Sequence, residues 1–119
     1  MANEIQLSAA VSVSKNGAAV SASGAAQATQ SGNATIENIQ NIGITQETLL
    51  LGDVGTPQYL FIKNLDATNF VQIDAASTFD KFPQKIVAGG FIILAPETAT
   101  IYAKADTAAV NVLVLGMSA

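Results

Sequence analysis

The chain lacks four residue types on which much protein chemistry depends. Its 119 residues include no cysteine, histidine, tryptophan or arginine. Without cysteine there is neither a disulfide nor a thiolate site, and without histidine the usual general base and metal ligand is missing. Nucleophilic catalysis would then need a serine–lysine or carboxylate arrangement, and most of the serines stand in a repetitive segment before residue 33. We therefore predict that the protein is not an enzyme and has no catalytic, cofactor-binding or metal-binding residues.

Charge is also scarce. Charged residues make up 12% of the chain, with five lysines against nine acidic residues, while hydrophobic residues reach 50%. Binding of nucleic acid depends on neutralising phosphates with lysine and arginine, so this balance argues against a nucleic-acid partner. So little charge predicts that part of the surface is covered by other subunits, and we expect a homo-oligomer, for which a trimer is one option. The alternative is that serine, threonine, asparagine and glutamine solvate the surface.

Long hydrophobic runs are absent as well. No apolar run approaches the roughly 20 residues that cross a bilayer as a helix, so we predict no membrane association. The first residues, Met1–Glu4, lack the basic start and apolar core of a signal peptide. We therefore expect synthesis in a cytoplasm without an export signal.

Residues 1–33 form a segment rich in alanine and serine. Apolar and polar residues alternate between residues 4 and 14, which is the period of a strand with one solvated face. The pair Asn16-Gly17 follows, and this dipeptide is the strongest short signal for a two-residue hairpin turn. The segment predicts an extended arm or hairpin that docks on a neighbouring subunit by strand addition, or a pair of edge strands on the protein's own sheet. A helix over Ala18–Gln30 is a third option, against which the serines and the two-residue period count.

Residues 34–119 are predicted to form one antiparallel β domain. About eight short apolar segments recur at intervals of roughly 8–12 residues, separated by glycine, proline and other turn residues. This spacing is typical of a β-sandwich or a barrel, and no helical pattern of ten or more residues is present. In the last two predicted strands, the side chains expected on one face are Ile101, Ala103, Ala105, Val110, Val112 and Val114.

The central part of this domain carries three predicted strands. Leu49–Leu51 is expected to be the first, and Tyr59–Lys63 and Asn69–Asp74 are expected to pair as an antiparallel hairpin around a polar turn. The isoleucine-rich segment before them predicts a strand with a bulge at Asn38–Asn41. Further on, Phe91–Ala95 contains no polar residue, which predicts a strand buried on both faces.

Oxygen ligands for a metal are few. Asp53, Asp66 and Asp74 stand at predicted turns, but their spacing matches no calcium loop. Turn aspartates most often accept hydrogen bonds from nearby backbone amides, and we expect this structural role here.

The aromatic residues allow two further interpretations. Tyr59 and Tyr102 are the side chains that a glycan-binding surface would use, although a place at the core edge explains them more simply. Phe79 and Phe82 stand in a predicted loop over Ala75–Pro83 and are expected to plug the end of the core. If they were exposed, they would mark a contact site.

Two segments of the chain resemble small virion structural proteins of tailed bacteriophages. They are LLLGDVGTPQYLFIKNLDATNFVQID and KIVAGGFIILAPETATIYAKADTAAVNVLVLG. In that group a GDVGTPGYLFIKNLD-TNYV type segment is followed by a K-L-AGEF turn and an A-YAKA-TAAV hairpin. The resemblance covers roughly residues 45–117, with Gln58 where glycine is common and Gly90 where an acidic residue is common. It implies a β-sandwich, often jelly-roll-like, that is incorporated in the particle.

Together the residues and the resemblance predict a non-enzymatic structural protein of a bacteriophage virion. The expected role is a capsid decoration (cement) protein that stabilises the head, with the major capsid protein or other virion proteins as partners. The alternatives are a tail or head-fibre component and a glycan- or receptor-binding β-sandwich module. The expected location is the virion, assembled in the host cytoplasm.

Overall fold

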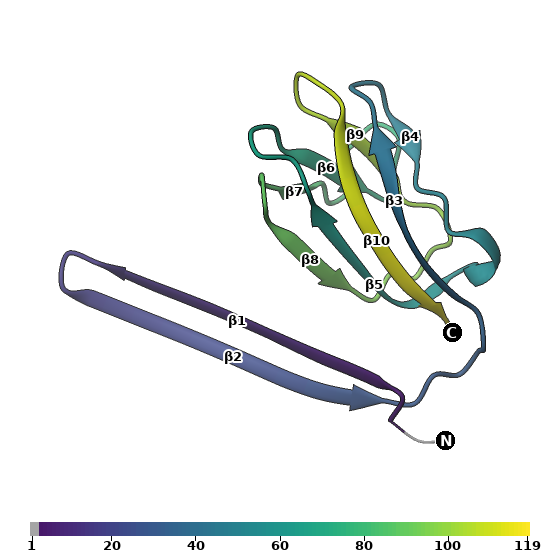
Figure 1. Ribbon diagram of the computed structural model, residues 1–119, viewed down its shortest axis with the longest axis horizontal. Coiled ribbons are helices and arrows are strands. Elements are labelled where there is room, and N and C mark those ends of the chain that lie inside the picture. Colours follow the sequence, from purple (N-terminus) through teal and green to yellow (C-terminus); the bar gives the residue numbers. More distant parts are fainter. Residues whose placement is uncertain (1–2) are drawn as a thin grey trace. The chain divides into compact units, whose positions relative to one another are not determined.

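In the protein, seen here in a computed structural model that describes residues 3–119, almost all of the regular secondary structure is β-strand (Figure 1). The strand pairs in this range are antiparallel, so the predicted all-β class is confirmed. The chain divides into two compact units, which we call the hairpin (residues up to Gln30) and the body (residues 31–119). Within the described range no helix has the length and apolar character needed to span a membrane. The elements are β1 (Ile5–Lys15), β2 (Ala18–Ala28), β3 (Thr35–Ile42), β4 (Glu47–Thr48), the 3-10 helix η1 (Gly52–Val54), β5 (Pro57–Asn64), β6 (Val71–Asp74), β7 (Gln84–Ile86), β8 (Phe91–Leu94), β9 (Tyr102–Ala105) and β10 (Val110–Ser118).

The hairpin is a two-stranded sheet in which β1 and β2 pair along their whole length. Asn16 and Gly17 connect them with φ values of 53° and 83°, the positive values that a type I′ turn requires. The hairpin predicted from this dipeptide is therefore confirmed, and the helix considered over Ala18–Gln30 is wrong. Edge strands on the body's sheet are also wrong, because β1 and β2 pair only with each other.

The body contains eight strands, as predicted, in two four-stranded sheets. The β10 sheet has the order β3-β10-β5-β8, and the β9 sheet has the order β4-β9-β6-β7. A single cluster of buried hydrophobic side chains takes members from both sheets. Because successive side chains of a strand point to opposite faces, every second residue of β9 and β10 enters this core. The prediction that Ile101, Ala103 and Ala105 share one face, and that Val110, Val112 and Val114 share one, is confirmed, and all six side chains are buried.

The pairing predicted between Tyr59–Lys63 and Asn69–Asp74 is wrong. Both segments contain strands, β5 and β6, but β5 lies in the β10 sheet and β6 in the β9 sheet. The connection between them therefore passes from one sheet to the other instead of turning back along the same sheet. A short polar loop can form a hairpin within one sheet or cross between two sheets, so the sequence pattern alone does not distinguish the two connections.

Asn64, the last residue of β5, fixes this connection. Its side chain is fully buried. Its amide nitrogen donates to the carbonyl oxygens of Asn69 (2.9 Å) and Ile86 (3.1 Å), and its Oδ1 accepts from the N–H of Asp66 (2.8 Å). The side chain thus joins β5, the crossing loop and β7, and it satisfies backbone groups that burial would otherwise leave unpaired.

Leu49–Leu51 is not a strand, although Leu49 and Leu51 are buried as its apolar pattern suggests. The strand β4 ends one residue earlier. At Leu50 a side chain takes the place of a strand partner: the Nε2 of Gln40 donates to the carbonyl of Leu50 (2.7 Å), and the N–H of Leu50 donates to the Oε1 of Gln40 (3.0 Å). This side-chain amide satisfies both backbone groups locally.

Two further predictions about strands are corrected. The bulge at Asn38–Asn41 is wrong, because β3 pairs with β10 residue by residue without a register shift. Burial of Phe91–Ala95 on both faces is also wrong. The strand β8 is an edge strand of the β10 sheet, so its side chains are half-buried and that of Phe91 is exposed.

Candidate interaction surfaces

One face of the hairpin consists of small apolar side chains. The register places Leu7 opposite Ala26, Val11 opposite Ala22 and Val13 opposite Val20, so the apolar residues of both strands share one face. The side chain of Val11 is 73% exposed and that of Val20 is 68% exposed. We define the hairpin apolar face as Leu7, Ala9, Val11, Val13, Val20, Ala22, Gly24 and Ala26.

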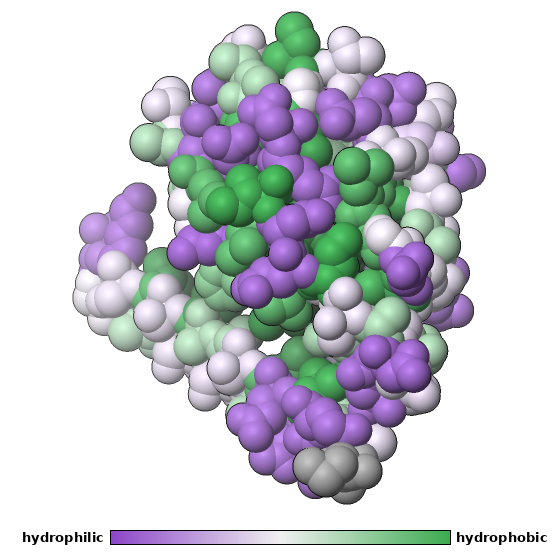
Figure 2. Space-filling view, turned by 45° about the vertical axis from the view of Figure 1, so that its right-hand side comes forward, coloured by the Kyte–Doolittle hydropathy of each residue, from purple (hydrophilic) through white to green (hydrophobic). Residues whose placement is uncertain are grey.

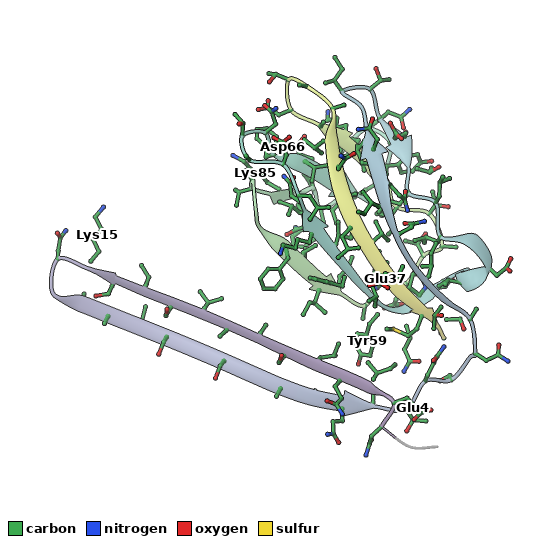
Figure 3. All side chains as sticks on the ribbon, in the orientation of Figure 1. Glu4, Lys15, Glu37, Tyr59, Asp66 and Lys85 are labelled. Atoms are coloured by element: carbon green, nitrogen blue, oxygen red, sulfur yellow. The ribbon has the colours of Figure 1, made fainter. Side chains whose placement is uncertain are left out.

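The opposite face of the hairpin is polar but almost uncharged. It presents Ser8, Ser12 and Ser14 from β1, together with serine, alanine and glutamine residues from β2. The described part of the hairpin carries two charges, Glu4 beside the start of β1 and Lys15 at the turn (Figure 3). The hairpin is therefore an amphipathic ribbon whose two charges lie at opposite ends.

The β10 sheet presents a second apolar surface on the side away from the core. Since Val112 and Val114 point into the core, the alternate residues of β10, such as Leu113 and Leu115, point outward. The register sets Ile39 and Phe91 in the same row across the sheet, and the rings of Phe61 and Phe91 meet edge to face with centroids 5.6 Å apart. We define the outer apolar face as Ile39, Tyr59, Phe61, Phe91, Ile93, Leu113, Leu115 and Met117, which are exposed or half-exposed. Two exposed charged residues share this side of the sheet, Lys63 between Leu113 and Phe91 and Glu37 beside Leu115.

The corresponding face of the β9 sheet is more polar. Lys85 in β7 and Lys104 in β9 flank the strand β6. Their Nζ atoms lie over the rings of Phe70 (4.5 Å) and Phe79 (4.6 Å), respectively. These cations cover aromatic rings that would otherwise face water.

Figure 2 shows hydrophobic side chains open at the surface among hydrophilic ones. The large side chains on the outer apolar face were missed from the sequence, although the unbroken apolar run of β10 carries the signal that both its faces are apolar.

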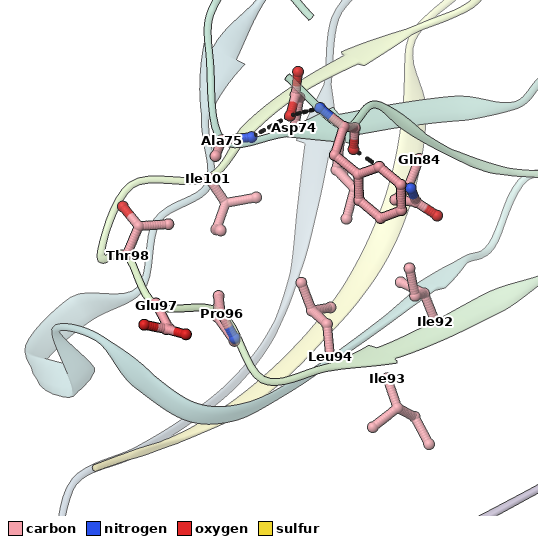
Figure 4. Close-up of a pocket in the computed structure, with 12 residues that line it drawn as sticks. Asp74, Ala75, Gln84, Ile92, Ile93, Leu94, Pro96, Glu97, Thr98 and Ile101 are labelled. Carbon is pink, nitrogen blue, oxygen red and sulfur yellow. Dashed lines mark hydrogen bonds between the residues drawn. The ribbon is translucent and has the colours of Figure 1, made fainter. Parts of the chain in front are cut away.

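A groove of about 370 Å³ lies along β6, β7 and β8 (Figure 4). Its walls are mainly apolar, with Ile73, Ile92 and Leu94 among them, and Phe82 at 75% exposure on its rim. The prediction that both loop phenylalanines plug the core is wrong: Phe82 is exposed, and Phe79 is half-buried under Lys104 and is not a member of the core cluster. The exposure of Phe82 favours a contact role. The groove suits apolar side chains.

The candidate aspartates serve the backbone. The N–H groups of Asn69 (2.6 Å) and Thr68 (2.9 Å) donate to Asp66 and hold its pKa below the ordinary value. Asp53 is exposed in η1. Among residues 3–119 no group of three or more acidic side chains is placed to hold a metal ion.

Asp74 stands at the end of β6 and organises the loop after it. Burial raises the pKa of Asp74, but the N–H groups of Lys81 (3.0 Å), Phe82 (3.0 Å) and Ala75 (2.7 Å) donate to its carboxylate, and the pKa is lowered overall. The predicted structural role of turn aspartates is thus confirmed for Asp66 and Asp74.

The two tyrosines do not form one site. Tyr59 lies in β5 on the outer apolar face, whereas Tyr102 lies in β9 of the other sheet. Each ring lies on the side of its own sheet that points away from the hydrophobic cluster, so the two rings belong to different sheets. A glycan platform built from both residues is therefore not present.

Comparison with known proteins adds no relative: a scan against protein-family models and searches of curated proteins and of solved structures found no match.

Proposed function

We propose that the body is a β-sandwich with jelly-roll topology. Numbered from β3 to β10 as strands one to eight, its sheets have the orders 1-8-3-6 and 2-7-4-5. An eight-stranded jelly roll has the same two orders, and the common hydrophobic cluster fits two sheets packed face to face. Jelly rolls occur in viral capsid proteins and in lectins, so the fold supports several functions and the surfaces have to decide.

On those surfaces we propose a non-enzymatic structural protein of a bacteriophage virion, a decoration protein that bridges subunits of the head. The observation that carries the proposal is the hairpin apolar face, an uncharged ribbon without cover in its own unit. A soluble monomer rarely keeps such a surface open, and exposed apolar faces of this kind mark contacts with other proteins. The sequence resemblance to phage virion proteins supports the same assignment.

The charge of the body agrees with a place on the outside of the shell. Residues 31–119 carry four lysines and eight acidic residues. Such a surface is repelled by the phosphates of a packaged genome, while contacts through neutral and apolar surfaces are unaffected. The protein would stabilise the head by mass action, because it binds the assembled lattice and not the separated subunits.

Quantitative mass spectrometry of purified particles tests the proposal. We expect the protein in a copy number of the same order as the major capsid protein, and particles that lack it should release their genome at a lower temperature. A few copies per particle, with label at one vertex or on the tail, would instead identify a tail or head-fibre component. Absence of the protein from particles would end the assignment.

A further inference from the structure

We propose that the hairpin of one copy covers the outer apolar face of a second copy, so that two chains exchange their hairpins reciprocally. This inference does not rest on the virion assignment, because it concerns only the two surfaces of this chain. The sizes of the side chains, the buried area and the charges favour a body, rather than a second hairpin, as the partner of the hairpin.

The two faces are complementary in side-chain size. The hairpin apolar face has alanine, valine and glycine, with Leu7 as its largest residue. The outer apolar face has large side chains, including Phe61, Phe91, Leu113 and Leu115. Sheets pack well when large side chains of one face enter spaces beside small side chains of the other. Two hairpin faces packed together would interdigitate little, and two outer faces would crowd each other.

The lengths of the two surfaces also agree. Eleven-residue strands at about 3.4 Å per residue make the hairpin about 37 Å long. The nine residues of β10 give the outer apolar face a length of about 30 Å along its central strand. One hairpin therefore extends over the full length of the sheet.

Buried area separates reciprocal exchange from pairing of two hairpins. A ribbon about 37 Å long and about 10 Å wide has a face of roughly 370 Å². Two hairpins packed face to face would bury about 740 Å² in total, which is below the roughly 1,000 Å² expected of a stable interface. Reciprocal exchange forms two such contacts and buries about 1,500 Å², which is the size of a standard interface.

Charge favours the same partner. The two charges of the hairpin, Glu4 and Lys15, balance, whereas the body has four more acidic residues than lysines. A hairpin on a body therefore meets no net repulsion. Contact between the outer apolar faces of two bodies would bring two acidic units together, which like-charge repulsion disfavours.

The test is the mass of the purified full-length protein, measured by light scattering without particles. We expect about 24 kDa, twice the 12.2 kDa of one chain. Val11→Asp on the hairpin apolar face should give monomers, whereas Ser12→Asp, one residue along the same strand on the polar face, should not. Likewise Ile39→Asp, on the outer apolar face, should give monomers, whereas Ile44→Asp, in the bend after β3, should not. The side chains are 62% and 58% exposed, so neither substitution puts a carboxylate into the core.

A mixing experiment distinguishes exchange from pairing of like surfaces. The Val11→Asp chain keeps its outer face and the Ile39→Asp chain keeps its hairpin, so the mixture at millimolar concentration should form a heterodimer with one intact contact. Neither variant alone should do so. A monomeric wild-type protein, an oligomer that Val11→Asp leaves intact, or a mixture that stays monomeric would each overturn the inference. A closed ring of more than two copies with the same variant pattern would support docking on a second copy. Because no particle is involved, these results stand apart from the outcome for the virion assignment.

Discussion

Replacing Asn64 by alanine tests how the two sheets of the body are joined. The buried side chain makes three hydrogen bonds, to the carbonyl oxygens of Asn69 and Ile86 and from the N–H of Asp66. Asn64→Ala removes all three and leaves the partner backbone groups in place. The substitution also removes little apolar packing, so the expected loss comes from the hydrogen bonds.

The size of the effect follows from the burial of each partner group. The bond to the carbonyl of Ile86 is buried, and leaving that carbonyl without a donor costs about 1–3 kcal/mol. The bonds to Asn69 and Asp66 are part-buried, so water can replace the side chain, and each loss costs about 0.5–1.5 kcal/mol. We expect a total of about 4 kcal/mol, a large share of the roughly 5–15 kcal/mol that stabilises a small domain.

Equilibrium denaturation in urea measures this loss, and thermal unfolding should show a fall in Tm of roughly 15–30 °C. The matched control is Asn111→Ala, which removes an exposed hydrogen bond of 3.0 Å between the side chains of Asn41 and Asn111. That bond competes with water, so the control should lose less than about 1 kcal/mol. If Asn64→Ala loses no more than Asn111→Ala, the side chain of Asn64 does not hold the sheets together.

Three further perturbations address the turn, the core and the acid side of the stability curve. Gly17→Ala puts a Cβ at a φ of 83°, so the hairpin should lose about 1–2 kcal/mol and its cross-strand nuclear Overhauser effects should weaken; unchanged effects would contradict the type I′ turn. Leu60→Ala, at a fully buried position, should cost about 2–5 kcal/mol in urea denaturation, while Leu50→Ala, at an exposed one, should cost less than about 1 kcal/mol; equal losses would contradict the core. The pKa values of Asp66 and Asp74 are lowered in the folded state, so their charged forms stabilise it above the unfolded pKa near 3.9, and this contribution is lost as pH falls through the folded values. Stability measured between pH 6 and 2 should therefore fall in the acid range, and Asp74→Asn should reduce that fall; a mutant profile parallel to the wild type would contradict the role of Asp74.

Local signals in the sequence were sufficient for the strands and for one turn. Asn16-Gly17 requires positive φ at both positions, which few other dipeptides provide, and the turn formed as predicted. The two-residue period of Val110, Val112 and Val114 likewise placed these side chains on one face, which the structure shows to be the buried one. Both signals depend on residues next to one another, where steric rules and alternation act directly.

Contacts between distant residues could not be predicted in this way. The partner of β5 is β10, more than forty residues along the chain, and nothing local to Tyr59–Lys63 names it. The amide of Gln40 replaces a strand partner for Leu50, and the amide of Asn64 crosses between sheets. Such side chains appear in the sequence as ordinary polar residues, because their role depends on what the fold brings beside them. The outer apolar face was missed for the same reason, since its members come from four strands.

The two apolar faces have no explanation within the fold of either unit. Every member of the body's hydrophobic cluster comes from residues 34–114, so the body has a core without the hairpin. A two-stranded ribbon buries neither of its faces, so the alternation maintained over β1 and β2 does not serve the hairpin's own core. Left in water, both faces would favour aggregation. Docking of a hairpin on another copy covers the large side chains of the sheet and the small side chains of the ribbon in the same contact. A pairing of like faces covers only one of these two surfaces and leaves the other in water.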